Sequence, residues 1–234
     1  MSMYRISLVI KRLFDIVMSV VGLVICFPIF LILAILIKLD SKGSVFFKQE
    51  RRGKNGKIFE IYKFRSMVQD AEKKGAGLFN FEGDPRVTKI GRFMRNTSLD
   101  ELPQFINVLN GTMSFVGPRP CVKNELGDYD TLNKRYKRRF QAVPGITGLA
   151  QVSGRNEIPW DEKVNYDNQY IDEFKKKGVF LDIYILVKTV LNVFARKDIY
   201  EAKVNEGISD EEAAKIAEME IIRKAHEPEI EELE

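Results

Sequence analysis

An apolar stretch near the N-terminus constrains this chain more than any other feature. Residues 13–37 carry a single charged side chain, Asp15. A helix that rises about 1.5 Å per residue would be roughly 37 Å long over this stretch, enough to cross a hydrocarbon core of about 30 Å. A signal peptide is excluded because the stretch is too long for one and no small-residue cleavage site follows it. The sequence therefore predicts a membrane segment.

Pro28 interrupts this stretch, and proline removes a backbone donor and kinks or breaks a helix. The arms 13–27 and 28–37 would be roughly 22 and 15 Å long, so neither crosses a membrane alone. Both flanks are rich in Lys and Arg, which favour the cytoplasmic side. A re-entrant hairpin satisfies both flanks, whereas a kinked spanning helix satisfies one and is tolerated in membranes. The residues leave both arrangements open, with the spanning helix slightly favoured, and both put the rest of the chain in the cytoplasm.

Composition narrows the chemistry. Lys and Arg number 37 against 33 Asp and Glu, and ten acidic but only three basic residues follow Ser209, so the remainder is strongly basic and suits an anionic partner. The two cysteines, Cys26 and Cys121, make neither a disulfide framework nor a zinc site. The one histidine, His226, lies in the acidic tail, which argues against histidine-based triads and metal sites. Catalysis is expected to depend on carboxylates, Lys, Arg and a hard metal ion.

The remaining chain predicts an α+β fold that is mostly helical. Residues 45–49 and 58–62, around Asn55-Gly56, are typical of a small β-hairpin. Apolar spacing predicts helices over 99–113 and 160–174, while breaker residues predict loops over 73–84, 118–120 and 143–148. Residues 181–194 form a helix that lies in the core or at the membrane interface, and composition favours the core. A capping pattern at Ser209 predicts one helix in the tail, ending near Pro228.

Two adjacent carboxylates, Asp100 and Glu101, begin the expected helix over 99–113. Backbone N–H groups and the helix dipole favour negative charge there, which would keep Asp100 ionised, as a nucleophile or a Mg²⁺ ligand must be. The alternative is structural, since Ser98 and Glu101 also fit a capping box.

Basic residues on or near loops are the second group of candidates. Arg119 is the most indicative because prolines on both sides fix its backbone and a guanidinium pairs well with phosphate oxygens. The alternative for most of them is solvation of the surface or contact with lipid headgroups. The basic run at 135–139 is expected to contact headgroups or to form a solvated helix face. Nucleic acid is not expected as a partner, since no binding motif is present. The other phosphate-binding candidates are Lys63, Arg65, Arg86 and Arg155.

Several motifs in fixed order resemble one family. They include Lys-Arg-Leu-Phe-Asp at 11–15, Lys-Phe-Arg-Ser-Met at 63–67, Thr-Ser-Leu-Asp-Glu-Leu-Pro-Gln at 97–104, Phe-Val-Gly-Pro-Arg-Pro at 115–120 and Val-Pro-Gly-Ile-Thr-Gly at 143–148. Over about residues 10–200 the chain resembles the bacterial sugar transferases known as monotopic phosphoglycosyl transferases, of the small single-domain type.

The resemblance implies a reaction and its parts. Such enzymes transfer a sugar-1-phosphate from a UDP-sugar to undecaprenyl phosphate, release UMP and start a bacterial surface glycan or glycoprotein. It implies that Asp100 attacks the β-phosphate and forms a covalent phosphosugar intermediate, that Glu101 is its partner, and that the pair holds Mg²⁺. Arg119 would bind phosphate or nucleotide, with Lys63, Arg65 and Arg155 as weaker candidates and Arg86 in the same basic group.

The resemblance also implies a membrane disposition. It favours a re-entrant hairpin bent at Pro28 over residues 1–39, a cytoplasmic catalytic domain over 40–205 with amphipathic helices at the interface, and an acidic tail over 206–234. The chain would lie on the cytoplasmic face of the bacterial inner membrane among its lipids, and assembly into a homo-oligomer stays open. Phe27 departs from the serine that familiar members carry before this proline. The rival hypothesis is a membrane-anchored scaffold without turnover.

Overall fold

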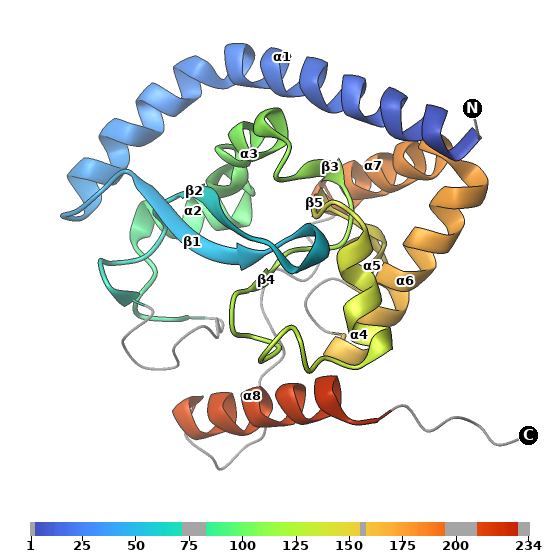
Figure 1. The fold of residues 1–234 in the computed structure, drawn as a ribbon. Coiled ribbons are helices and arrows are strands. Elements are labelled where there is room, and N and C mark those ends of the chain that lie inside the picture. The colour runs from blue at the N-terminus through green and yellow to red at the C-terminus, as the bar shows by residue number, and fades with distance from the viewer. Residues whose placement is uncertain (1–2, 72–82, 155–157, 195–209, 229–234) are drawn as a thin grey trace, which may run out of the picture.

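The computed structural model describes residues 3–71, 83–154, 158–194 and 210–228. A long N-terminal helix lies over a body made of two small sheets and short helices, and a C-terminal helix lies on the opposite side of that body (Figure 1). The fold is α+β and mostly helical, as the sequence predicts. The expected loop at 73–84 lies almost wholly outside the described residues.

Helix α1, Met3–Asp40, forms one arc over the body (Figure 1). The helix continues through Pro28 without interruption, so the expected break there is not found. Pro28 removes only one backbone donor, and the apolar turns on both sides of it stay helical. The helix therefore curves smoothly at this point instead of breaking. A helix of this length is about 57 Å long, well beyond a hydrocarbon core.

The inner face of α1 is fixed to the body at both ends. Near the N-terminus the buried Asp15 carboxylate accepts a hydrogen bond from the backbone N–H of Phe115, and Arg12 donates to the carbonyls of Val108 and Leu109. Near the C-terminal end of α1, Leu33 and Ile37 pack in a core cluster with Phe64 and Met94. The charges at the start of the apolar stretch therefore face protein rather than lipid.

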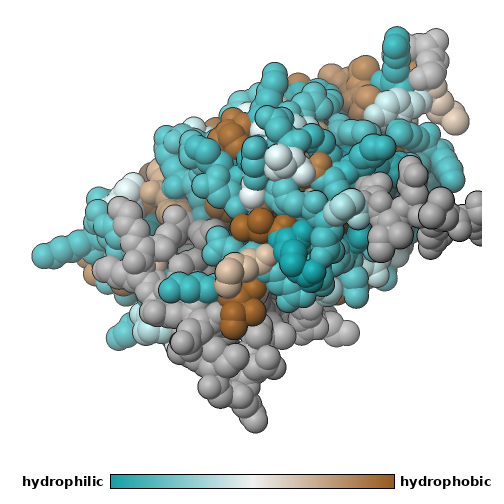
Figure 2. Space-filling model, turned by 60° about the horizontal axis from the view of Figure 1, so that its bottom comes forward, coloured by the Kyte–Doolittle hydropathy of each residue, from teal (hydrophilic) through white to brown (hydrophobic). Residues whose placement is uncertain are grey.

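The outer face of α1 is apolar and exposed. By length and composition α1 can cross a membrane, and only 11 % of its most apolar window is buried. A core helix of a soluble protein would be mostly buried, so this exposure argues for membrane association. Figure 2, which brings the side away from α1 forward, shows a mostly hydrophilic surface.

The β-hairpin is confirmed. Strands β1, Phe46–Arg52, and β2, Ile58–Phe64, pair antiparallel with Phe46 opposite Phe64. The connection η1, Lys54–Gly56, places Asn55 and Gly56 at φ 55° and 76°, the left-handed region that an Asn-Gly turn supplies. Strand β4, Cys121–Val122, adds to the free edge of β1.

A second sheet has one of its two strands in 143–148, a segment that the sequence predicts to be a loop. Strands β3, Ser114–Val116, and β5, Gly145–Thr147, pair in parallel. Glycine permits the pairing: a Cβ on Gly145 would lie 2.1 Å from the nitrogen of Gly117, and one on Gly148 would lie 2.1 Å from its oxygen. Breaker residues here mark close backbone approach rather than a turn.

Between the sheets the chain forms α2, Lys89–Asn96, then the short η3, Leu99–Glu101, and α3, Gln104–Asn110. The single helix expected over 99–113 is therefore wrong in its extent. Pro103 directly precedes α3, where its missing N–H costs nothing, and it separates Asp100 and Glu101 from that helix.

The rest of the body consists of α4, Lys134–Arg138, η4, Arg139–Gln141, α5, Leu149–Ser153, α6, Trp160–Lys177, and α7, Val179–Phe194. The helices expected over 160–174 and 181–194 correspond to α6 and α7. One face of α7 joins the core through Leu181 and Ile185. The opposite face exposes large apolar side chains such as Val187 and Leu191, as a helix at a membrane interface would.

The acidic tail contains α8, Asp210–His226, as predicted. This helix docks on the body: Ala225 is fully buried in a cluster with Leu126 and Tyr136, and its carbonyl accepts from the N–H of Asn133. Lys224 pairs with Asp161 at 3.3 Å. The tail helix is therefore packed against the body rather than solvated on all sides.

Candidate active site

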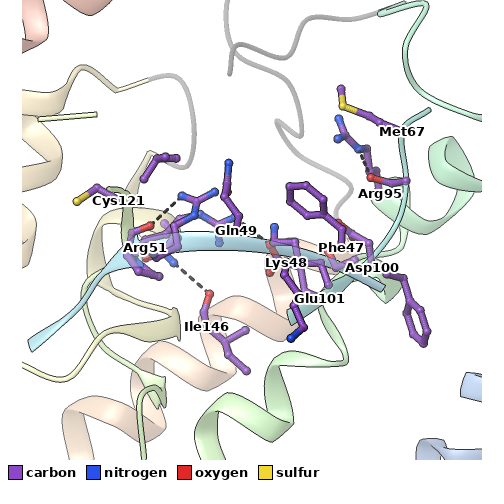
Figure 3. A pocket seen from close by; sticks show the side chains of 18 of the residues that line it. Phe47, Lys48, Gln49, Arg51, Met67, Arg95, Asp100, Glu101, Cys121 and Ile146 are labelled. Carbon is purple, nitrogen blue, oxygen red and sulfur yellow. Dashed lines mark hydrogen bonds and ion pairs between the residues drawn. The ribbon is translucent and has the colours of Figure 1, made fainter. Parts of the chain in front are cut away.

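The carboxylate of Glu101 joins three segments that are distant in the sequence. Its Oε1 atom accepts from Lys63 Nζ of β2 at 2.8 Å and from a guanidinium nitrogen of Arg119, after β3, also at 2.8 Å. The fold thus brings together three residues that sequence analysis selected separately. In Figure 3 Asp100 and Glu101 lie beside β1, close to Phe47 and Lys48.

The backbone just before Asp100 and Glu101 sets the direction in which the chain enters this acidic pair. Ser98 adopts φ 57°, a left-handed conformation that turns the chain sharply before η3. The Ser98 side chain makes no capping hydrogen bond, so the capping-box alternative is wrong. The dipole of the helix was also expected to stabilise these carboxylates. However, α3 begins only after Pro103, so Asp100 and Glu101 are not in its first turn. Positive side chains, not a helix terminus, supply the field around these carboxylates.

Asp100 is buried, with 8 % of its surface exposed, and lines a cavity. Among the described residues no hydrogen bond or ion pair reaches its carboxylate. Burial raises the pKa of Asp100 to about 6, and the charge of Glu101 adds to the rise while Lys63 opposes it. The side chain is a poorly solvated carboxylate without a fixed partner, and such a group is available to a ligand.

The pKa of the adjacent Glu101 shifts in the opposite direction to that of Asp100. Burial alone would raise its pKa, but Arg119 and Lys63 outweigh burial and hold the pKa well below its ordinary range. Glu101 is therefore a permanent anion that orients two cations. Its charge makes the pocket less positive than Lys63 and Arg119 would make it alone.

The cavity has a volume of about 680 Å³, within the range of a nucleotide-sized site. Arg95 and Met67 lie at one end of the view in Figure 3 and Arg51 and Cys121 at the other. Five predicted site residues line the cavity: Lys63, Arg65, Asp100, Glu101 and Arg119. Residues outside that prediction also line it, among them Arg95, Arg139, Trp160 and Asp167.

Two predicted phosphate-binding residues, Arg65 and Arg86, have other partners. Arg65 lines the cavity, but its guanidinium donates to the carbonyls of Ile37, Ser41 and Lys42 at the end of α1. Arg86 is buried outside the cavity lining, where it pairs with Asp84 at 2.7 Å. Arg155 lies outside the described residues.

Arg119 itself is held through the backbone around it. Its carbonyl accepts from Arg139 at 2.7 Å, and the carbonyl of Pro120 accepts from Arg51 at 3.0 Å. Arg139 was expected at a headgroup or on a solvated helix face, and both expectations are wrong because the residue is buried. No periodicity marks Arg139 or its ion-pair partner Asp167, so sequence reasoning missed both.

The donor set also bears on a metal ion. Among the described residues no three His, Cys, Asp or Glu side chains gather into a metal site. Mg²⁺ usually takes only one or two carboxylates and completes its shell with water and substrate phosphates. The Asp100 carboxylate, which has no partner in the part of the chain that the structure describes, lies beside the ionised Glu101, and this pair fits that pattern.

Comparison with known proteins identifies the family. The profile of the family described as bacterial sugar transferase matches residues 6–196, and the chain belongs to this family. It is 46 % identical over 202 residues to the galactosyl transferase CpsE of Streptococcus agalactiae serotype III, covering 81 % of this chain and 43 % of that one.

Two further relatives carry more specific names. The UDP-glucose:undecaprenyl-phosphate glucose-1-phosphate transferase of Klebsiella pneumoniae is 44 % identical over 200 residues, which cover 83 % of this chain and 42 % of the relative. The undecaprenyl-phosphate galactose phosphotransferase of Salmonella typhimurium strain LT2 is 41 % identical over 210 residues, covering 84 % and 43 %. The chain thus spans less than half the length of these three relatives. The family profile ends at residue 196, before α8 begins.

Proposed function

We propose that this protein transfers a sugar-1-phosphate from a UDP-sugar to undecaprenyl phosphate and releases UMP. The names of the Klebsiella and Salmonella relatives supply the reaction class. The observation that carries it to this chain is the pairing of Lys63 and Arg119 on Glu101 beside the buried Asp100, which has no partner among the residues placed in the structure. The product would begin a bacterial surface glycan or glycoprotein.

The proposed chemistry has two displacements at one phosphorus. A carboxylate oxygen of Asp100 attacks the β-phosphorus of the UDP-sugar, and the bond from that phosphorus to the bridging oxygen breaks, so UMP leaves. The resulting aspartyl phosphosugar is attacked by a phosphate oxygen of undecaprenyl phosphate, which releases Asp100 and forms the lipid diphosphate sugar. Each step exchanges one P–O bond for another.

The surrounding cations support attack by one anion on another. Lys63 and Arg119 can donate to phosphate oxygens while Glu101 holds them in place, and a fixed donor costs little reorganisation as charge moves. Burial makes the ionised Asp100 a better nucleophile than a solvated carboxylate. Mg²⁺, held by Asp100 and Glu101, would neutralise diphosphate charge when bound.

The protein is proposed to lie on the cytoplasmic face of the inner membrane as a monotopic protein. Both ends of α1 are fixed to the same body, through Arg12 and Asp15 at one end and Ile37 at the other. A helix that crossed the bilayer would separate its ends. The exposed outer faces of α1 and α7 would then lie in the lipid, with both ends of α1 on the side of the membrane that holds the body.

The test is UMP release by the purified protein in nanodiscs with Mg²⁺, undecaprenyl phosphate and a panel of UDP-sugars. We expect release that needs metal and lipid, and we expect Asp100→Asn to abolish it. Asp130→Asn, an exposed residue away from the cavity, is the matched control and should keep full turnover. The panel also names the sugar.

A single-turnover arm tests the covalent step. Protein mixed with UDP-sugar and Mg²⁺ but no lipid should release at most one UMP per chain and gain the mass of one sugar phosphate on Asp100. Release of UMP only when lipid is added, with no mass gain in its absence, would argue for direct transfer to the lipid. Release without lipid and without a mass gain would mean hydrolysis of the sugar phosphate by water. No release with any sugar from folded protein, even with Mg²⁺ and lipid present, would favour the rival hypothesis, a membrane-anchored scaffold.

A further inference from the structure

At residues 118–120, the loop that carries Arg119 is held through its carbonyl oxygens. Pro118 and Pro120 have no N–H to donate, so the usual means of fixing a loop is missing on both sides of Arg119. The three successive carbonyls of 118–120 accept instead from the N–H of Gly145 at 2.9 Å, from Arg139 at 2.7 Å and from Arg51 at 3.0 Å. Two of these three donors are arginine side chains from other segments.

Arg139 is itself rigidly mounted. Its Nε donates to Asp167 Oδ2 at 2.8 Å, and only 3 % of the Arg139 side chain and 2 % of the Asp167 side chain are exposed. The guanidinium lies over the Trp160 ring at 4.9 Å from its centroid. A buried guanidinium of this kind is expensive unless it is paired and packed, and here Asp167 supplies the pairing.

Burying a charge pair to hold one carbonyl is a poor way to gain stability. An apolar pair of similar volume often stabilises a core as well or better. The arrangement is better explained by the residue whose carbonyl is held. That residue is Arg119, and its side chain reaches Glu101. A guanidinium can bond Asp167 through Nε and Arg119 through a second nitrogen at a fixed angle, which a lysine ammonium cannot reproduce.

We propose that Arg139, oriented by Asp167, is a positioning residue that sets the place of the Arg119 guanidinium for the diphosphate of the nucleotide sugar. The role rests on the function proposed above, since it deepens that same site. Arg139 acts through the backbone of residue 119 and touches no reacting atom.

The first test is a double-mutant cycle between residues 139 and 119. Arg139→Lys keeps a positive charge for Asp167 and should lower kcat/KM for the UDP-sugar by about 100-fold, the scale of a misplaced binding group. In an Arg119→Ala background the same Arg139→Lys substitution should cost less than about twofold, because the residue it positions is gone. The KM for undecaprenyl phosphate should not change.

The matched control is Arg138→Lys, one residue earlier. Arg138 pairs with Asp172 nearer the surface and should change kcat/KM by less than about twofold in either background. If Arg139→Lys unfolds the protein, the double variant Arg139→Gln with Asp167→Asn replaces the charge pair by two neutral amides and enters the same cycle. Thermal unfolding of every variant is measured alongside.

A second readout separates this inference from the proposed activity. The Kd for UDP with Mg²⁺ is measured by calorimetry for the same four proteins, and it needs no turnover. Coupling between 139 and 119 in the Kd supports the positioning role even if no sugar supports UMP release. Equal losses from Arg139→Lys with and without Arg119, in folded protein, overturn it, as does a wild-type protein that does not bind UDP.

Discussion

Asp100 and Glu101 are neighbours with opposite electrostatics, and partners decide the difference. Burial acts on both, but Glu101 has two cations in hydrogen-bond contact and Asp100 has none among the described residues. A carboxylate that is held by donors is stabilised as an anion and loses reactivity. The pair therefore divides into an orienting anion and an available one, and the sequence shows only that the two are adjacent.

Cys121 lines the same cavity, and its thiol is expected to be inert. Burial raises the pKa of Cys121 to about 11, so about one thiol in a thousand is ionised at pH 8. In a Cys26→Ser variant, Ellman's reagent at pH 8 should find no reactive thiol in the folded protein and one after unfolding in guanidinium. Rapid reaction in the folded state would show that the cavity wall opens.

At the scale of elements, charge fixes the membrane helix to the body. Lys11 donates to Asp182 of α7 at 2.6 Å and to the carbonyl of Val116 at 2.7 Å, and Tyr170 also donates to Asp182. The basic residue before the apolar stretch is thus a docking residue as well as a flank. The register of α1 on the body follows from this contact and from Asp15.

Removing Lys11 should destabilise this junction strongly. Lys11→Met leaves the mostly buried Asp182 carboxylate without its cation, a change that costs about 3 to 5 kcal/mol. The measurement is the thermal unfolding midpoint in nanodiscs. Adding Asp182→Asn should restore much of the loss. Lys123→Met, which removes an exposed pair with Glu50, should move the midpoint little, and an equal shift would contradict the argument.

Helix α8 lies outside the family match but is packed as part of the body. Ala225→Glu places a charge in a fully buried position and should detach the helix and lower the unfolding midpoint. Met219→Glu changes an exposed position of the same helix and serves as the control. Faster proteolysis after residue 195 in Ala225→Glu alone would report detachment directly. Equal midpoints for the two variants would mean that α8 contributes no stability.

For the whole molecule, the fixed ends of α1 predict that both lie on one side of the membrane. Single cysteines at Met3→Cys and Lys42→Cys, in a chain without Cys26 and Cys121, are treated with an impermeant maleimide on spheroplasts. We expect neither to react until the membrane is opened, and then both. Reaction of Met3→Cys alone in intact spheroplasts would instead show a spanning helix.

Local signals sufficed where an element is defined by neighbours in the chain. The Asn55-Gly56 turn predicted the β-hairpin, and apolar spacing predicted α6. The apolar composition of 181–194 predicted α7, and a capping pattern predicted the tail helix. They failed where long-range contacts override them. The glycines around 145 predicted a loop but form a parallel strand, since only a partner strand reveals why a Cβ is excluded.

The sequence by itself determined the apolar N-terminal segment, the acidic pair and the basic residues that suit phosphate, because composition and short spacing carry that information. Only the tertiary structure decided which cations serve the pair. Lys63 and Arg119 meet Glu101, while Arg65 turns to the end of α1 and Arg86 to Asp84. An arginine looks the same in every segment of a sequence, and its role depends on the carbonyls and carboxylates that folding places within its reach.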